Sequence, residues 1–130
     1  MKSFIFASLL FIALVVGKDS HAASTQEILS WCKPMTENTE ILANGEIRIK
    51  PNNIQSGICW GSFGIIQEII THIYEGGEKP FYEICAPPES TRLQLINIFV
   101  VYAKSNPKLH HQDFFDIALE SLRDSFPCEK

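Results

Sequence analysis

Residues 54–77 read IQSGICWGSFGIIQEIITHIYEGG, and this stretch decides the fold class. Isoleucines recur in it at spacings of three and four, which is typical of one face of a helix. The apolar stripe that we expect to face the core comprises Ile58, Ile65, Ile66, Ile69, Ile70 and Ile73. A Gly-Gly pair then signals the end of the helix. The sequence therefore predicts a long amphipathic helix that starts at Ile54 or Gly57 and ends at about Tyr74.

Three glycines, Gly57, Gly61 and Gly64, recur within this helix. Their spacings of four and three place them on one helical face, where another backbone can approach closely. Each glycine costs up to about 1 kcal/mol of helix stability relative to alanine, so their clustering calls for a reason. We interpret the three glycines as sites of close helix packing and not as a ligand-binding motif.

Three further helical segments give an expected all-α fold, a small bundle of four or slightly more helices with little strand. The first covers residues 25–32, with Ser24 as its cap and Pro34 as its stop. The third covers 89–104 and is apolar nearly all round, as expected of a helix that is central in its bundle or shared with a partner subunit. The fourth covers about 112–126. Its expected core face comprises Phe115, Ala118, Leu119, Leu122 and Phe126.

Two connectors separate the helices. Residues 34–57 are polar and contain an Asn-Gly turn signal. Around that turn we expect a helical turn over 39–43, and residues 47–49 alternate like a short strand. Residues 78–88 form the second connector, because their prolines forbid a regular helix.

Charge and composition exclude several classes of protein. The 130 residues include 11 Lys and Arg against 15 Asp and Glu, which gives a formal net charge of −4. This acidic balance argues against a nucleic-acid-binding protein, which needs a basic face, and less strongly against docking on anionic lipid. With 45% hydrophobic and 20% charged residues, the chain is expected to fold as one domain.

Residues 1–22 are typical of a secretory signal peptide, with a basic start and an apolar run over 4–16. A membrane-spanning helix needs about 20 apolar residues, so we expect no membrane insertion. Cleavage is expected after Ala22, with Gly17 as a second candidate. Residues 23–130 then form the single helical domain.

Four cysteines, Cys32, Cys59, Cys85 and Cys128, lie in that domain, and in a small exported chain they indicate two disulfides. A zinc site is disfavoured because no close Cys-x-x-Cys pair is present. Three pairings are possible. An up-and-down bundle favours Cys32–Cys59 with Cys85–Cys128, because the helix ends that carry them are neighbours. The alternative, Cys59–Cys85 with Cys32–Cys128, applies if residues 78–85 run back along the second helix.

Catalytic motifs are missing from the sequence. It contains no G-x-S-x-G elbow, no H-E-x-x-H zinc helix and no glycine-rich phosphate loop. His110, His111 and Asp113 cluster, and we interpret them as a solvated helix start in preference to a metal site. We therefore expect no catalytic residue, no metal and no cofactor.

A series of short motifs resembles a known family in its order and spacing. The series is Cys59-x-Gly61-x-x-Gly64, Cys85-Ala86-Pro87, Gln94, an apolar run to Tyr102, Asn106-Pro107, Ala118-Leu119 and Phe126-Pro127-Cys128. It resembles the Tai-type (Rap/Tai) immunity proteins of type VI secretion systems over residues 29–128, and least over 34–57. Those small exported bacterial proteins neutralise peptidoglycan-cleaving amidase toxins.

The resemblance implies an all-helical fold, a periplasmic location, no catalysis, an exported amidase toxin as partner and often a homodimer. Two other functions stay open, a periplasmic chaperone and an envelope or secretion accessory subunit. For an inhibitor, we expect a connector loop to plug the toxin cleft. The first candidate loop carries Glu75 and Glu78 for steering and Phe81 and Tyr82 as aromatic anchors. The turn over 104–111 is the second candidate.

The signal-peptide hypothesis predicts the N-terminus of the exported protein. N-terminal sequencing of periplasmic protein should begin at Ala23, because signal peptidase cleaves after small residues such as Ala22. Protein that keeps Met1 and stays in the cytoplasm would contradict both the export and the disulfide expectations.

Overall fold

The computed structural model describes residues 22–49, 53–75 and 80–129. In this described part, four α-helices, one short β-hairpin and two 3-10 turns confirm the expected all-α four-helix bundle. The helices are α2 (Thr25–Glu37), α3 (Ile54–Glu75), α4 (Arg92–Ser105) and α5 (Phe114–Ser125). The other elements are β1 (Thr39–Ile41), β2 (Ile47–Ile49), η1 (Phe81–Glu83) and η2 (Pro107–Leu109). Residues 1–21 of the expected signal peptide lie outside the described part.

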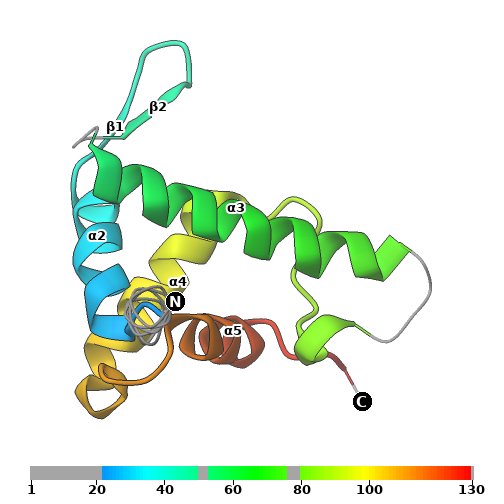
Figure 1. Cartoon of the computed structure of the whole chain (residues 1–130). Coiled ribbons are helices and arrows are strands. Elements are labelled where there is room, and N and C mark those ends of the chain that lie inside the picture. Colours follow the sequence, from blue (N-terminus) through cyan, green and yellow to red (C-terminus); the bar gives the residue numbers. More distant parts are fainter. Residues whose placement is uncertain (1–21, 50–52, 76–79, 130) are drawn as a thin grey trace, which may run out of the picture.

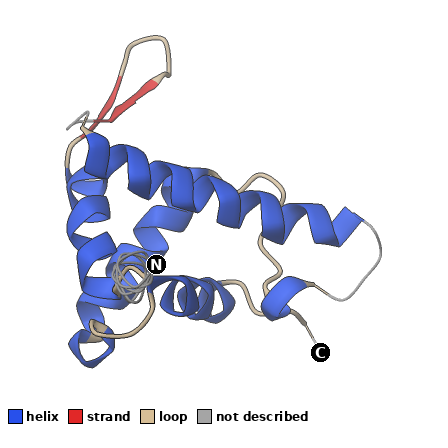
Figure 2. Ribbon diagram, in the orientation of Figure 1, coloured by secondary structure: helices blue, strands red, loops and turns tan. Residues whose placement is uncertain are grey.

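The helices pack around one core, and the β1–β2 hairpin projects from one end of them (Figure 1). Helix α2 packs against both α3 and α4, and α4 packs in turn against α3 and α5. Figure 2 shows that helices make up most of the described chain. None of the helices in the described residues is long and apolar enough to cross a membrane.

Three phenylalanines from three helices form the centre of the core. Phe63 of α3 lies 5.5 Å from Phe99 of α4 and 5.7 Å from Phe114 of α5, measured between ring centroids. Phe99 and Phe114 meet edge to face at 5.3 Å, a geometry that aromatic pairs favour. Helix α2 covers this cluster with Ile28 and Met35, both of which are buried. The core is therefore shared by all four helices.

Each of the four helices begins at a side-chain cap. The capping residues are Ser24, Asn53, Thr91 and Asp113. Ser24 is the cap that the sequence predicts for the first helix, and Asp113 places the His-His-Asp cluster at a helix start, as expected. Because Thr91 and Asp113 accept the first free N–H groups, α4 and α5 begin at Arg92 and Phe114, two or three residues later than predicted.

Pro34 does not end the first helix, which corrects the sequence prediction. Helix α2 continues to Glu37, and the Asn38 N–H donates to the Pro34 carbonyl at 3.1 Å. The extra turn buries Met35 in the core. Burial of a methionine side chain contributes about 1.5–3 kcal/mol, which offsets much of the penalty for a proline inside a helix.

The expected helical turn over 39–43 is also wrong, since Thr39–Ile41 forms strand β1. It pairs antiparallel with β2, the strand expected over 47–49, with Ile41 opposite Ile47. Gly45 closes the hairpin with a φ of +82°, and its N–H donates to the Leu42 carbonyl at 2.9 Å. The Asn-Gly turn signal therefore belongs to a hairpin.

The core face of α3 differs from the predicted isoleucine stripe. Cys59, Phe63, Ile66 and Ile70 are buried, whereas Ile58 and Ile65 are exposed. On α5, Phe115 is similarly 37% exposed, although it was expected on the core face. A helix rotated by one residue carries the same apolar spacing, so the periodicity alone does not set the buried face.

The three glycines of α3 are not sites of helix-to-helix approach within the described chain. At Gly57 and Gly61, an added Cβ would meet nothing within 4 Å, so close packing is absent there. At Gly64, the added Cβ would lie 2.9 Å from the guanidinium carbon of Arg92, which also stands 4.8 Å from the Trp60 ring centroid. Gly64 thus makes room for the Arg92 side chain and not for the backbone of another helix.

The favoured disulfide pairing is confirmed. Cys32–Cys59 joins α2 to α3 with a Cα–Cα distance of 5.4 Å, and Cys85–Cys128 joins the segment before α4 to the end of the chain at 5.0 Å. In the chain-entropy account, loops of these lengths each contribute about 3–4 kcal/mol to stability.

The aromatic cluster predicts a large loss of stability on truncation. Phe63→Ala should lower the free energy of unfolding by about 3–5 kcal/mol, because it opens a cavity between three helices. Phe115→Ala is the matched control, since it removes the same side chain from a 37% exposed site and should cost much less. Urea unfolding with both disulfides intact measures the two losses, and equal losses would contradict the assigned core.

Candidate functional site

The segment that follows α3 has a strained backbone and a rigid base. In η1, Tyr82 has a φ of +56° and Glu83 a φ of +58°, values that are uncommon for residues other than glycine. Such residues cost of order 1–3 kcal/mol each and persist where the surroundings hold them. The residue that follows, Ile84, is fully buried and pairs with Pro127 in an isolated β-bridge.

Two further bonds hold the base of this segment against the C-terminal segment. The Cys85 N–H donates to the Phe126 carbonyl at 2.8 Å, and the Cys85 sulfur is bonded to Cys128. The bridge, the hydrogen bond and the disulfide join two adjacent residues, Ile84 and Cys85, to residues 126–128. They hold the exposed Tyr82 and Glu83 at a fixed place beside α5.

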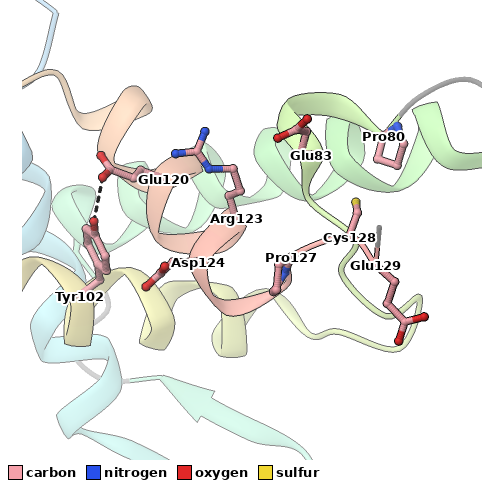
Figure 3. Close-up of a pocket in the computed structure, with 9 residues that line it drawn as sticks. All are labelled: Pro80, Glu83, Tyr102, Glu120, Arg123, Asp124, Pro127, Cys128 and Glu129. Carbon is pink, nitrogen blue, oxygen red and sulfur yellow. Dashed lines mark hydrogen bonds between the residues drawn. The ribbon is translucent and has the colours of Figure 1, made fainter.

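A cleft of about 620 Å³ lies between this segment, α4, α5 and the C-terminal residues (Figure 3). Its lining residues are Pro80, Glu83, Tyr102, Glu120, Arg123, Asp124, Pro127, Cys128 and Glu129. Four of these carry carboxylates and one carries a guanidinium, so the described lining is acidic. The cleft can therefore bind a positively charged group.

Arg123 connects α5 to the η1 segment. Its guanidinium carbon lies 5.0 Å from the centroid of the Tyr82 ring, within the range of a cation–π contact. Both side chains are exposed, so the contact contributes about 0.5–1 kcal/mol. It holds the Tyr82 ring beside Arg123, which lines the cleft, and leaves the ring 42% exposed.

Tyr102 lies at the α4 side of the cleft and donates its hydroxyl to Glu120 Oε1 at 3.0 Å (Figure 3). Burial raises the pKa of Tyr102 above 10.0, and the hydrogen bond to Glu120 and the charges of Glu120 and Asp124 raise it further. Arg123 acts in the opposite direction. The phenol therefore stays a neutral donor at physiological pH and orients the Glu120 carboxylate.

The expected partner-binding residues differ in how exposed they are and in whether the structure describes them. Tyr82 is exposed, as an aromatic anchor requires, whereas Phe81 is half-buried and packs against the core, so Tyr82 is the more accessible of these two rings. Glu75 is the last residue of α3, and Glu78 lies outside the described residues. In the second candidate turn, His110 Nε2 lies 2.9 Å from the Ala103 carbonyl oxygen, and the His110 carbonyl accepts from the Gln26 N–H at 2.9 Å.

Sequence reasoning missed the cleft beside the loop. Glu120, Arg123 and Asp124 share one face of α5 by their spacing, and they lie outside the core face expected for this helix. Tyr102 and Glu83 reach the cleft from two other segments. No local sequence pattern indicates this site, because its residues come from α4, α5, the η1 segment and the C-terminal segment.

Comparison with protein families identifies the chain. The model of the Rap1a immunity proteins matches residues 51–128, which is more than half of the sequence. The chain belongs to this family. The resemblance to Rap/Tai immunity proteins is thereby confirmed, and the matched region includes α3, α4, α5, the η1 segment and most of the cleft. Helix α2 and the hairpin lie outside the match. No curated protein and no solved structure matches the chain.

The hydrogen bond between Tyr102 and Glu120 predicts that Glu120 affects the pKa of Tyr102. Glu120→Gln should lower the pKa of Tyr102 toward 10.0, because a negative charge next to the phenol is removed. Alkaline titration of tyrosine absorbance measures this pKa, and the Tyr102→Phe variant identifies the Tyr102 step.

The raised pKa of Tyr102 also makes the stability of the protein depend on pH in the alkaline range. Folded Tyr102 binds its proton more tightly than the unfolded chain does, so its contribution is complete below pH 10.0 and is lost as the pH rises through the raised pKa. Glu120→Gln should therefore reduce the alkaline loss of stability. A Tyr102 step that does not move in the variant would contradict the coupling.

Proposed function

We propose that this family member is a periplasmic immunity protein that binds and inhibits a type VI secretion peptidoglycan amidase toxin by occluding its active-site cleft. The match to the Rap1a immunity proteins over residues 51–128 carries this proposal. The export signal proposed for residues 1–22 supports the location, because a toxin that cleaves peptidoglycan acts in the same compartment. The family resemblance also supports a homodimer.

The segment at 75–82 is proposed as the occluding element. A plug binds best when it is held rigid before binding, since less conformational entropy is then lost. The Cys85–Cys128 bond, the Ile84–Pro127 bridge and the Arg123–Tyr82 contact supply that rigidity at its C-terminal end. Tyr82 is then the aromatic anchor, in the manner of interface hot spots.

The acidic lining of the cleft supports a basic contact surface on the toxin. Glu83, Asp124 and Glu129 lie next to Tyr82 or along the same cleft. Carboxylates grouped in this way accelerate association with a positively charged rim and make the association sensitive to salt. The proposed contact therefore combines one central aromatic ring with an acidic border.

The proposal predicts which substitutions weaken toxin binding. Glu78→Ala and Tyr82→Ala should each raise the dissociation constant for the proposed amidase toxin by about tenfold or more, equal to about 1.4 kcal/mol. Phe81→Ala should have a smaller direct effect and lower stability as well, because Phe81 packs against the core. Calorimetry with the purified toxin and survival of toxin-expressing cells measure these changes.

Matched control variants test whether loss of toxin binding is specific to substitutions in the loop. Phe115→Ala removes an exposed aromatic ring from α5, and Glu27→Ala removes an exposed carboxylate from α2, so both should bind like the parent. If the loop variants fold and protect cells as the parent does, the loop assignment is wrong. If the parent binds no neighbouring amidase, the chaperone or accessory-subunit hypothesis replaces the inhibitor hypothesis.

A further inference from the structure

The outer face of α3 is apolar and uncovered in the described chain. Ile54, Ile58 and Ile65 are 79%, 42% and 63% exposed, and they follow the helical spacing of four and seven. Gly57 and Gly61 lie between them, also exposed. The opposite face of the same helix carries the buried Cys59, Phe63 and Ile66. Helix α3 thus has two apolar faces, and the described residues cover one of them.

Contacts among the described residues of one chain do not explain the composition of this outer face. Glycine in an exposed helix interior costs up to about 1 kcal/mol relative to alanine, and an alanine methyl would meet no atom within 4 Å at Gly57 or Gly61. Large isoleucine side chains on either side remain in contact with water. Small residues between large apolar ones allow a second helix to approach closely.

We propose that the outer face of α3 packs against the same face of a second copy of this chain, with the two helices antiparallel about a two-fold axis at Gly61. The inference rests on the homodimer proposed above and assigns its interface. In this arrangement Gly61 meets Gly61 of the second copy, and Ile58 of each copy packs beside Ile65 of the other. Such an interface is self-complementary, as two-fold symmetry requires.

The charge distribution favours a second copy over the toxin on this face. Residues 54–67 contain no charged side chain, so two acidic chains can approach here without placing like charges opposite each other. A basic partner finds no carboxylate along the same stretch, whereas four carboxylates line the cleft beside α5. The two surfaces therefore suit different partners.

In the antiparallel arrangement, an acidic residue of each copy lies next to the N-terminus of α3 of the other copy. The first turn of α3 has no acidic residue, although negative charge near a helix N-terminus is stabilising. Glu68 and Ile54 lie seven residues on either side of Gly61. The two-fold axis therefore brings Glu68 of each copy next to the N-terminus of α3 of the other. A parallel arrangement would place Glu68 beside Glu68 instead.

Sedimentation equilibrium of the purified protein tests the interface. The parent should be a dimer, and Ile58→Lys and Ile65→Lys should each raise its dissociation constant by about 100-fold or more, because a buried unpaired charge opposes association. Val101→Lys is the matched control, since Val101 is 57% exposed on α4, and this variant should remain dimeric. Circular dichroism verifies that each variant is folded.

Cysteine cross-linking tests the register. Gly61→Cys should form an intermolecular disulfide on mild oxidation, since its two copies meet at the axis. Gly57→Cys should not, because its copies lie about 12 Å apart along the helices, farther than a disulfide reaches. Both sites have room for the new side chain. Cross-linking at both positions would indicate parallel helices and overturn the proposed geometry.

The outcomes separate this inference from the proposed function. A parent that sediments as a monomer overturns the homodimer and this interface together, while inhibition of the toxin is measured independently. A dimer that survives Ile58→Lys and Ile65→Lys overturns this face alone. Loss of toxin binding in these variants with the dimer intact would assign the face to the toxin and also overturn the inference.

Discussion

The Cys32–Cys59 bond sets the rotation of α3, and much of the molecule follows from that rotation. Both cysteines are fully buried, so the bond holds one face of α3 against α2 and directs Phe63 and Ile66 into the core. The residues half a turn away then point outward. A helix with apolar residues on two faces has two possible core faces, and the disulfide is compatible with one of them.

The second disulfide organises the other end of the molecule. By joining Cys85 to Cys128, it places the strained Tyr82 beside Arg123 of α5 and creates an acidic cleft there. This end differs in chemistry from the uncharged outer face of α3. The proposed toxin contact uses steering by charge and one aromatic anchor, and the proposed dimer contact uses close apolar packing. An immunity protein with both contacts can bind its toxin while it remains a dimer.

Local sequence signals failed at two places, where burial in one case and strand pairing in the other decided the conformation. Pro34 disfavours a helix interior, yet the helix continues because Met35 becomes buried in the following turn. Residues 39–41 have no strong preference of their own and become a strand because β2 pairs with them across the turn at Gly45. At Pro34, burial of the next residue offset a penalty of about 3 kcal/mol, and at residues 39–41 pairing with the neighbouring strand decided the conformation.

The sequence by itself determined the four helices, the β2 strand and the family, because helix periodicity, turn signals and motif spacing are local or ordered along the chain. It favoured one disulfide pairing and left an alternative open, and the structure decided between them. Only the tertiary structure decided which face of α3 is buried, that Phe81 packs inward while Tyr82 stays exposed, and that Tyr102 meets Glu120. Those outcomes depend on contacts between segments far apart in sequence, and a one-residue rotation of a helix changes them without changing its pattern.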